Sequence, residues 1–111
     1  MKSKSSTTTS KAQPELLPLI TPGEYLAEEF LEPLGLSANA LALALRVPAT
    51  RIQAIVKGER GITAETALRL AQYFGTTPEF WMNLQANYEL DKVRREKLQQ
   101  IKVEVQRRPA A

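Results

Sequence analysis

The apolar residues of this chain recur every three or four positions in five stretches that proline, glycine and hydroxyl residues separate. This spacing is typical of amphipathic α-helices that bury one face, and it predicts an all-α fold. The helices are predicted over about residues 22 to 34, 37 to 46, 48 to 57, 64 to 74 and from 78 onward. Their predicted inward residues are Leu26, Ala27, Phe30, Leu31, Leu34, Leu41, Ala42, Leu45, Ile52, Ile55, Val56, Ala67, Leu68, Ala71, Phe74, Phe80, Trp81, Leu84 and Tyr88.

The residues that bound these stretches have the chemistry of helix ends. Residues 21 to 24, TPGE, form a capping box with proline at the first helical position. Ser37 can accept hydrogen bonds from free backbone N–H groups, and Thr77 is followed by proline. Gly58 and Gly75 supply the left-handed conformation that ends a helix.

Residues 37 to 58 place two short helices and a turn at the spacing of a helix-turn-helix. Ala42 is small enough for the helices to approach closely, and Val47, Ile52 and Ile55 fill the angle between them. The second helix is then a rigid probe that fits the major groove of DNA. A helical hairpin in an ordinary bundle has the same spacing, but the helices predicted on both sides favour a repressor-type DNA-binding domain.

The outward stripe of the second helix supplies the candidate base contacts. The methyl groups of Thr50 and Ala54 suit thymine methyls, and Gln53 can pair with adenine. Arg51 flanks the stripe, where it can reach guanine or a phosphate. Backbone N–H groups at helix starts can also hold phosphates. The predicted DNA-binding residues are Ser37, Ala49, Thr50, Arg51, Gln53, Ala54, Lys57, Arg60 and Thr63, with Lys57 and Arg60 mainly on phosphate.

Composition divides the 111 residues into three segments. Residues 1 to 15 are a basic Ser/Thr-rich tail without apolar periodicity, predicted to be disordered. Residues 16 to 90 form the predicted five-helix repressor-like domain, and residues 91 to 111 form a charged helical extension. The net charge of +3 divides into +2, −3 and +4 over these segments, so DNA binding must rest on local placement of cations.

Aromatic and apolar residues at helical spacing begin the last helix. They most simply belong to the core, but a tryptophan here can also lie in a dimer interface, where large aromatics contribute much of the binding energy. The candidate dimerisation residues are Phe80, Trp81, Leu84 and Tyr88.

Several functional classes are excluded by what the sequence lacks. It has no cysteine and no histidine, which removes disulfides and makes a zinc site unexpected. It shows no nucleophile with a base and no phosphate-binding glycine loop, so we predict that it is not an enzyme and has no cofactor or metal. No apolar run is long enough for a membrane span and no secretory signal opens the chain, so a soluble cytoplasmic protein is expected.

The segments PGEYLAEEFLEPLGLS and GERGITAETALRLAQYFGTTPEFWMNLQANYEL, with the helix-turn-helix between them, closely resemble the HigA (VapI-like) antitoxins of the Xre helix-turn-helix family. The resemblance covers Thr21 to about Glu96, and residues 63 to 88 are its most diagnostic part. Arg46 stands where most such turns carry glycine, so we expect a turn that is less left-handed or strained.

The resemblance implies a homodimeric repressor that binds double-stranded operator DNA of its own operon and neutralises a HigB-type ribonuclease toxin. It suggests the acidic first helix, with Glu24, Glu28 and Glu32 beside Glu29, as the toxin-binding surface. A solvated face explains these glutamates more simply, and a catalytic metal site fits worst. The alternative function is a solitary Xre-type regulator without a toxin.

Overall fold

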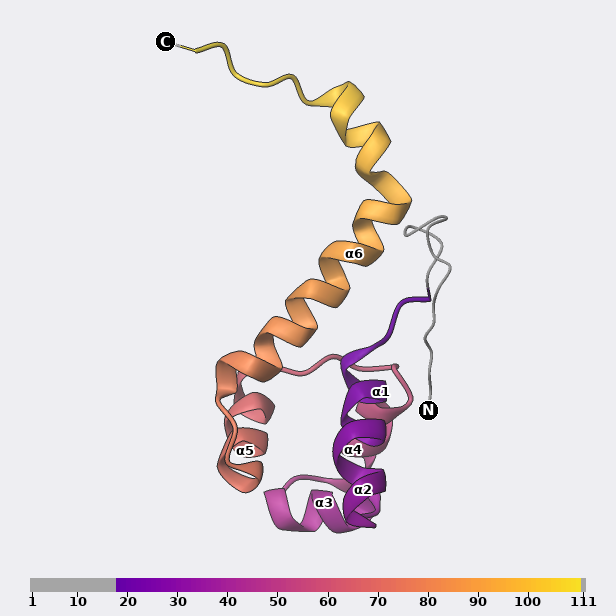
Figure 1. The fold of residues 1–111 in the computed structure, drawn as a ribbon, viewed down its shortest axis with the longest axis vertical. Coiled ribbons are helices and arrows are strands. Elements are labelled where there is room, and N and C mark those ends of the chain that lie inside the picture. Colours follow the sequence, from indigo (N-terminus) through magenta and orange to yellow (C-terminus); the bar gives the residue numbers. More distant parts are fainter. Residues whose placement is uncertain (1–17, 111) are drawn as a thin grey trace.

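The computed structural model describes residues 18–110, which form helices and loops without a strand (Figure 1). The first helix is one continuous run of α1 (Pro22–Leu26), η3 (Ala27–Leu31) and α2 (Glu32–Leu34). It is followed by α3 (Ala38–Leu45), α4 (Ala49–Val56), α5 (Ala64–Phe74) and α6 (Pro78–Glu104). The predicted all-α, five-helix fold is confirmed over this part of the chain. The tail predicted to be disordered, residues 1 to 15, lies outside the described residues.

The predicted helix starts are confirmed by their caps. The Thr21 hydroxyl accepts a hydrogen bond from the Glu24 backbone N–H at 3.0 Å, and the Glu24 carboxylate accepts one from the Thr21 N–H at 3.3 Å. The hydroxyls of Ser37, Thr63 and Thr77 each accept from the backbone N–H three residues on, at 3.0, 3.3 and 3.1 Å. These local bonds fix where four of the five helices begin, while α4, which follows Pro48, has no side-chain cap.

The first helix contains a π-helical turn that the sequence pattern does not reveal. Pro33 lacks an N–H, and in an α-helix its ring would collide with the carbonyl of Glu29. The preceding turn η3 widens instead, and the Glu32 N–H donates to the Ala27 carbonyl, five residues back. The extra residue shifts the helical phase, so Leu34, predicted to point inward, is 62% exposed.

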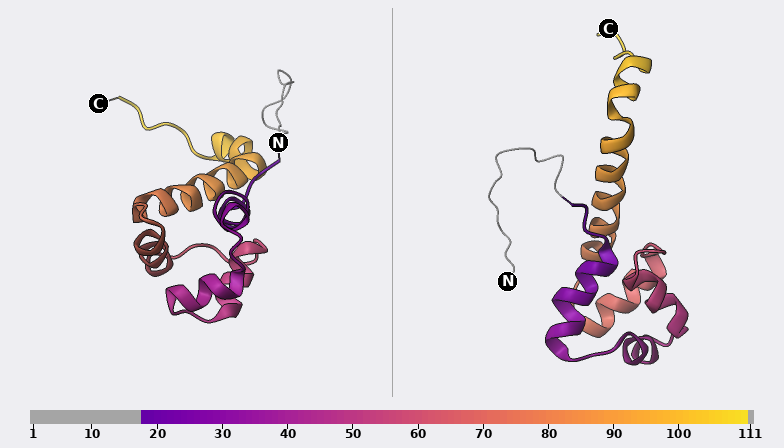
Figure 2. Two further views of the ribbon diagram at one scale, coloured as in Figure 1. Left: turned by 60° about the horizontal axis from the view of Figure 1, so that its bottom comes forward. Right: turned by 90° about the vertical axis from the view of Figure 1, so that its right-hand side faces the viewer.

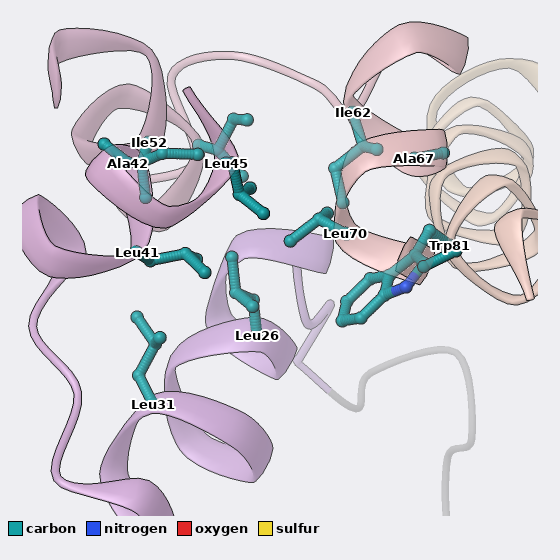
Figure 3. Close-up of a cluster of buried hydrophobic side chains, with 12 residues drawn as sticks. Leu26, Leu31, Leu41, Ala42, Leu45, Ile52, Ile62, Ala67, Leu70 and Trp81 are labelled. Carbon is teal, nitrogen blue, oxygen red and sulfur yellow. The ribbon is translucent and has the colours of Figure 1, made fainter. Parts of the chain in front are cut away.

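The core lies between the first helix, α3, α4, α5 and the start of α6 (Figure 3). Trp81 is fully buried, and its indole N–H donates to the Thr76 hydroxyl at 2.7 Å. Leu68, predicted to point inward, is 59% exposed and lines a groove between α3 and α5. The buried residues of α5 are Thr66, Ala67, Leu70 and Ala71, which share a face that Leu68 does not.

Helix α6 contributes to the core only through its first turns. It packs against α5 and α1, and its remaining length projects away from the other helices (Figures 1 and 2). The helix runs unbroken across the predicted domain boundary at residues 90 and 91, ending at Glu104. Apolar side chains on the projecting part, among them Leu90, Val93 and Ile101, are exposed.

Candidate nucleic-acid interface

The turn between α3 and α4 has the left-handed conformation that usually requires glycine. Arg46 has φ 62° and ψ 45°, so the expectation of a less left-handed turn is wrong and its alternative, a strained turn, describes the structure. The conformation lets the N–H groups of Arg46 and Val47 return to the carbonyls of Leu43 and Ala42, at 3.2 and 3.0 Å. An arginine in this conformation costs about 1 kcal/mol or more. Closure of the turn by these hydrogen bonds offsets that cost.

Helix α4 has a buried face and an outward face, as its sequence predicts. Ile52 and Ile55 are buried in the core. Thr50 and Lys57 are exposed, and Gln53 and Ala54 between them are half-buried. Ala49, at the first turn, is half-buried and packs partly against the core. The structure thus places most of the predicted base-reading residues along one accessible stripe.

The side chain of Arg51 does not extend from the outward face of α4. It is 23% exposed, and Nη1 lies 4.0 Å from the Oε1 atom of Glu65 on α5. Its Nε is buried and has no hydrogen-bond partner among the described residues. A hydrogen bond from Arg69 and the charges of Arg69 and Arg51 lower the pKa of Glu65, so the carboxylate remains charged opposite Arg51. Contact of Arg51 with DNA remains a prediction. It requires the Arg51 side chain to leave its position beside Glu65.

Arg69 on α5 braces the helix-turn-helix, a role that sequence analysis missed. Its Nη1 donates to the Leu45 carbonyl at the end of α3, at 2.9 Å. Nε and Nη2 donate to the Oε2 atom of Glu65 at 3.2 and 2.9 Å. The i, i+4 spacing of Glu65 and Arg69 was a readable signal for their ion pair. The hydrogen bond from Arg69 to the Leu45 carbonyl, 24 residues away in the chain, could not be predicted from such spacing.

The loop after α4 carries two of the predicted phosphate contacts and is held from α6. Lys57 and Arg60 are exposed on either side of Gly58, which has φ 78°. The side-chain oxygen of Gln85 on α6 accepts a hydrogen bond from the Ile62 N–H at 2.8 Å. Gln85, also missed from the sequence, therefore fixes the end of this loop where α5 begins.

Two helix starts lie among the predicted DNA contacts. The hydroxyls of Ser37 and Thr63 are engaged in capping α3 and α5, and Thr63 Oγ1 also bonds Thr66 Oγ1 at 3.2 Å. Their expected role therefore belongs to backbone N–H groups rather than to the hydroxyls. A further polar contact joins α3 to α4, because the Gln53 amide Nε2 donates to Asn39 Oδ1 at 2.7 Å.

The candidate dimerisation residues divide into one core residue and three partly accessible ones. Trp81 is fully buried within the chain, which agrees with the core interpretation and leaves it no surface for a second copy. Phe80 is half-buried and packs edge-on against Trp81, with ring centroids 5.0 Å apart. Leu84 and Tyr88 are half-buried and lie near Ile20, which is 59% exposed.

The candidate toxin-binding residues lie on the first helix. Glu24, Glu28 and Glu32, together with Glu29, are exposed. Over residues 18–110, no group of three or more acidic, histidine or cysteine side chains is arranged to hold a metal ion. Within the same residues, no helix has the length and apolar character needed to cross a membrane.

Known proteins resemble this chain over the residues just described. The helix-turn-helix family matches residues 28–81. Virulence-associated protein I of Dichelobacter nodosus is 53% identical over 81 residues, covering 73% of this chain and 75% of that protein. Antitoxin HigA-1 of Vibrio cholerae is 41% identical over 71 residues, covering 64% of this chain and 67% of that protein.

A solved structure extends the similarity to the fold. The Pseudomonas aeruginosa antitoxin HigA with the higBA promoter is 43% identical and superposes with a TM-score of 0.78, covering 81% of this chain and 98% of that one. The chain therefore belongs to the Xre-type helix-turn-helix family, in the group of HigA antitoxins and VapI-like proteins.

Proposed function

We propose that this chain is an antitoxin that represses its own operon, binding operator DNA as a dimer and neutralising a HigB-type ribonuclease toxin. The observation that carries the DNA-binding part is the geometry of α4. Ile52 and Ile55 anchor one face in the core while Thr50, Gln53 and Lys57 lie along the other. The similarity to the HigA structure with promoter DNA supports the same use of the helix.

Base reading belongs to outward residues of α4, and phosphate binding to residues at its end and in the loop that follows. Thr50 and Ala54 contact thymine methyl groups, and Gln53 pairs with adenine. Lys57 and Arg60 contact phosphates and position the helix without reading sequence. The backbone N–H groups at the starts of α3 and α5 supply further phosphate contacts, which suits a domain whose residues 16 to 90 carry a net charge of −3.

Dimerisation supplies the specificity that a single short helix lacks. In a two-fold dimer, the two α4 helices enter successive major grooves about 34 Å apart on a palindromic operator. Leu84, Tyr88 and Ile20 form an accessible apolar patch where α6 leaves the body of the domain. This patch is the dimer surface we infer, with Phe80 at its margin.

The acidic first helix is the surface we propose for the toxin. A ribonuclease that binds RNA carries positive charge, and complementary potentials accelerate encounter and fix orientation. The four exposed glutamates, at positions 24, 28, 29 and 32, are the densest negative group in the described sequence. A toxin bound there need not compete with the DNA surface on α4.

The proposal is tested first by footprinting the full-length protein on the DNA upstream of its gene, with sedimentation at the same concentration. Two symmetric half-sites one helical turn apart and a dimer are expected. Gln53→Ala should weaken binding, whereas the matched control Gln72→Ala, on an exposed position of α5, should not. A single asymmetric half-site bound by a monomer would contradict the dimeric repressor.

The antitoxin part is tested by expressing the neighbouring gene alone and together with this chain. Growth arrest that this chain relieves is the expected result. If the operator is bound but no neighbouring product is toxic, the solitary Xre-type regulator is the correct function.

A further inference from the structure

Asn39 and Gln53 come from different helices of the helix-turn-helix and join their side chains at its surface. Asn39 lies in the first turn of α3 and is exposed, and Gln53 lies in the middle of the outward stripe of α4. The Gln53 Nε2 atom donates to Asn39 Oδ1 at 2.7 Å, across 14 positions of sequence. Among the hydrogen bonds of residues 18–110, it is the one that joins a side chain of α3 to a side chain of α4.

We propose that Asn39 is a positioning residue that sets the base preference of Gln53, holding its amide in the orientation that reads adenine. The inference rests on the proposed function, in which α4 reads base edges in the major groove. It concerns a residue of α3 that does not itself have to contact a base.

The donor and acceptor inventory of a glutamine amide explains the preference. The amide has two N–H donors on Nε2 and one acceptor oxygen, Oε1. Recognition of adenine uses one N–H, directed to N7, and the oxygen, which accepts from the N6 amino group. Asn39 takes the remaining N–H. All three hydrogen-bonding groups of the amide are then used without conflict.

The opposite orientation would give a different preference. If the Gln53 oxygen faced Asn39, the Nε2 group would face the groove and present two donors. Two donors match the N7 and O6 acceptors of guanine and repel the amino group of adenine. The choice between the two bases is therefore made by which amide atom of Gln53 faces Asn39, and in the structure that atom is Nε2.

The position of Asn39 favours this arrangement on DNA. Asn39 Oδ1 faces Gln53, and over residues 18–110 its own amide N–H groups have no hydrogen-bond partner. Phosphate oxygens accept hydrogen bonds and cannot donate them. A phosphate near the start of α3 therefore attracts the Asn39 N–H groups and keeps Oδ1 directed at Gln53. Docking on the backbone and reading of the base are coupled through one side chain.

The test compares full-length Asn39→Ala, Asn39→Asp, Gln53→Ala and the double variant Asn39→Ala/Gln53→Ala with the parent. Each is titrated by fluorescence anisotropy onto the footprinted operator and onto operators with every base pair replaced in turn. The position read by Gln53 is the one at which Gln53→Ala loses discrimination. The parent should prefer A·T there by roughly tenfold or more.

Asn39→Ala should reduce that preference several-fold, with the preferences at other positions unchanged. Asn39→Asp should retain it, because a carboxylate accepts the same N–H, while its charge weakens binding to all sequences at low salt. In the Gln53→Ala background, Asn39→Ala should have no effect on discrimination at that position.

Three results would overturn the inference: full adenine preference in Asn39→Ala, a guanine preference in the parent, or an effect of Asn39→Ala that persists without Gln53. Each of these still leaves a protein that binds an operator. Absence of operator binding by the parent is a different result and refutes the proposed function itself.

Discussion

Gly23 lies where the first helix crosses α4, and it provides the sharpest test of how α4, the helix that we propose reads DNA, is held. The residue is buried within α1. A Cβ added there would overlap the carbonyl oxygen of Ile55 and lie 2.5 Å from its carbonyl carbon and 2.9 Å from the Cα of Val56. These atoms belong to the backbone of α4, so no side-chain rotation can relieve the contact.

The expected cost of Gly23→Ala follows from two opposing effects. Alanine is favoured over glycine inside a helix by about 0.5–1 kcal/mol. The carbonyl oxygen is the closest atom, so the two backbones must separate by more than the 0.9 Å that would bring the carbonyl carbon from 2.5 Å to an ordinary 3.4 Å, and this separation loosens the packing of Leu26 against the core. Overpacking of this kind costs roughly 1–3 kcal/mol, and more when backbone must move. We expect a net destabilisation of about 3 kcal/mol.

Thermal and urea unfolding, followed by far-UV circular dichroism, measure this change. For a domain of this size, about 3 kcal/mol lowers the melting temperature by roughly 12–24 °C. Gly35→Ala is the matched control, because Gly35 has φ 63° and no atom within 4 Å of an added Cβ. It loses the same backbone freedom in the unfolded chain and costs only the left-handed conformation, roughly 1–2 kcal/mol.

If Gly23→Ala is as stable as the parent, or less destabilised than Gly35→Ala, then the first helix does not approach the backbone of α4 as closely as the structure shows. Operator affinity gives a second measurement, taken at a temperature where both proteins are folded. Because α4 itself is displaced, Gly23→Ala should weaken binding more than Gly35→Ala does.

Three further predictions concern charge. Lys57→Ala should weaken binding to all DNA sequences alike and reduce the salt slope of log K by about one unit, and a change in the preferred operator would assign Lys57 to base reading instead. Arg69 and Arg51 lower the pKa of Glu65, so the charged carboxylate stabilises the fold above its ordinary pKa of 4.5, and this stabilisation is lost as pH falls through the lower pKa of the folded state. The melting temperature of Glu65→Gln should therefore fall less steeply with acid pH than that of the parent. Glu28→Gln/Glu32→Gln should slow association with the toxin, most at low salt, and leave DNA affinity equal or slightly higher; an unchanged rate in stopped-flow would make these glutamates a solvated face.

The sequence by itself determined the elements of this protein whose causes lie within a few residues. Thr21 and Glu24 cap each other, and Thr77 caps α6 over three residues, so these helix starts could be predicted from the sequence. The alternation of buried Ile52 and Ile55 with the outward stripe also repeats at helical spacing. The helix-turn-helix and the outward stripe of α4 could therefore be predicted.

The helical phase after Pro33 and the conformation of the turn at Arg46 were harder to predict, because two local rules compete at each of these places. Pro33 is compatible with a helix end or with a widened turn, and in the structure the turn widens, with Leu31 buried and Leu34 exposed. At Arg46, the general preference of side chains against φ > 0 loses to the hydrogen bonds that close the turn.

The contacts that orient the site were decided by the tertiary structure alone. Asn39 meets Gln53, Arg69 meets the Leu45 carbonyl, and Gln85 meets the Ile62 N–H across 14, 24 and 23 positions of sequence. No periodicity links such pairs, because hydrogen bonds need distances near 3 Å and directions that arise only when whole helices have packed. Helical spacing tells which face of α4 is outward, and the packed helices decide how its side chains are held.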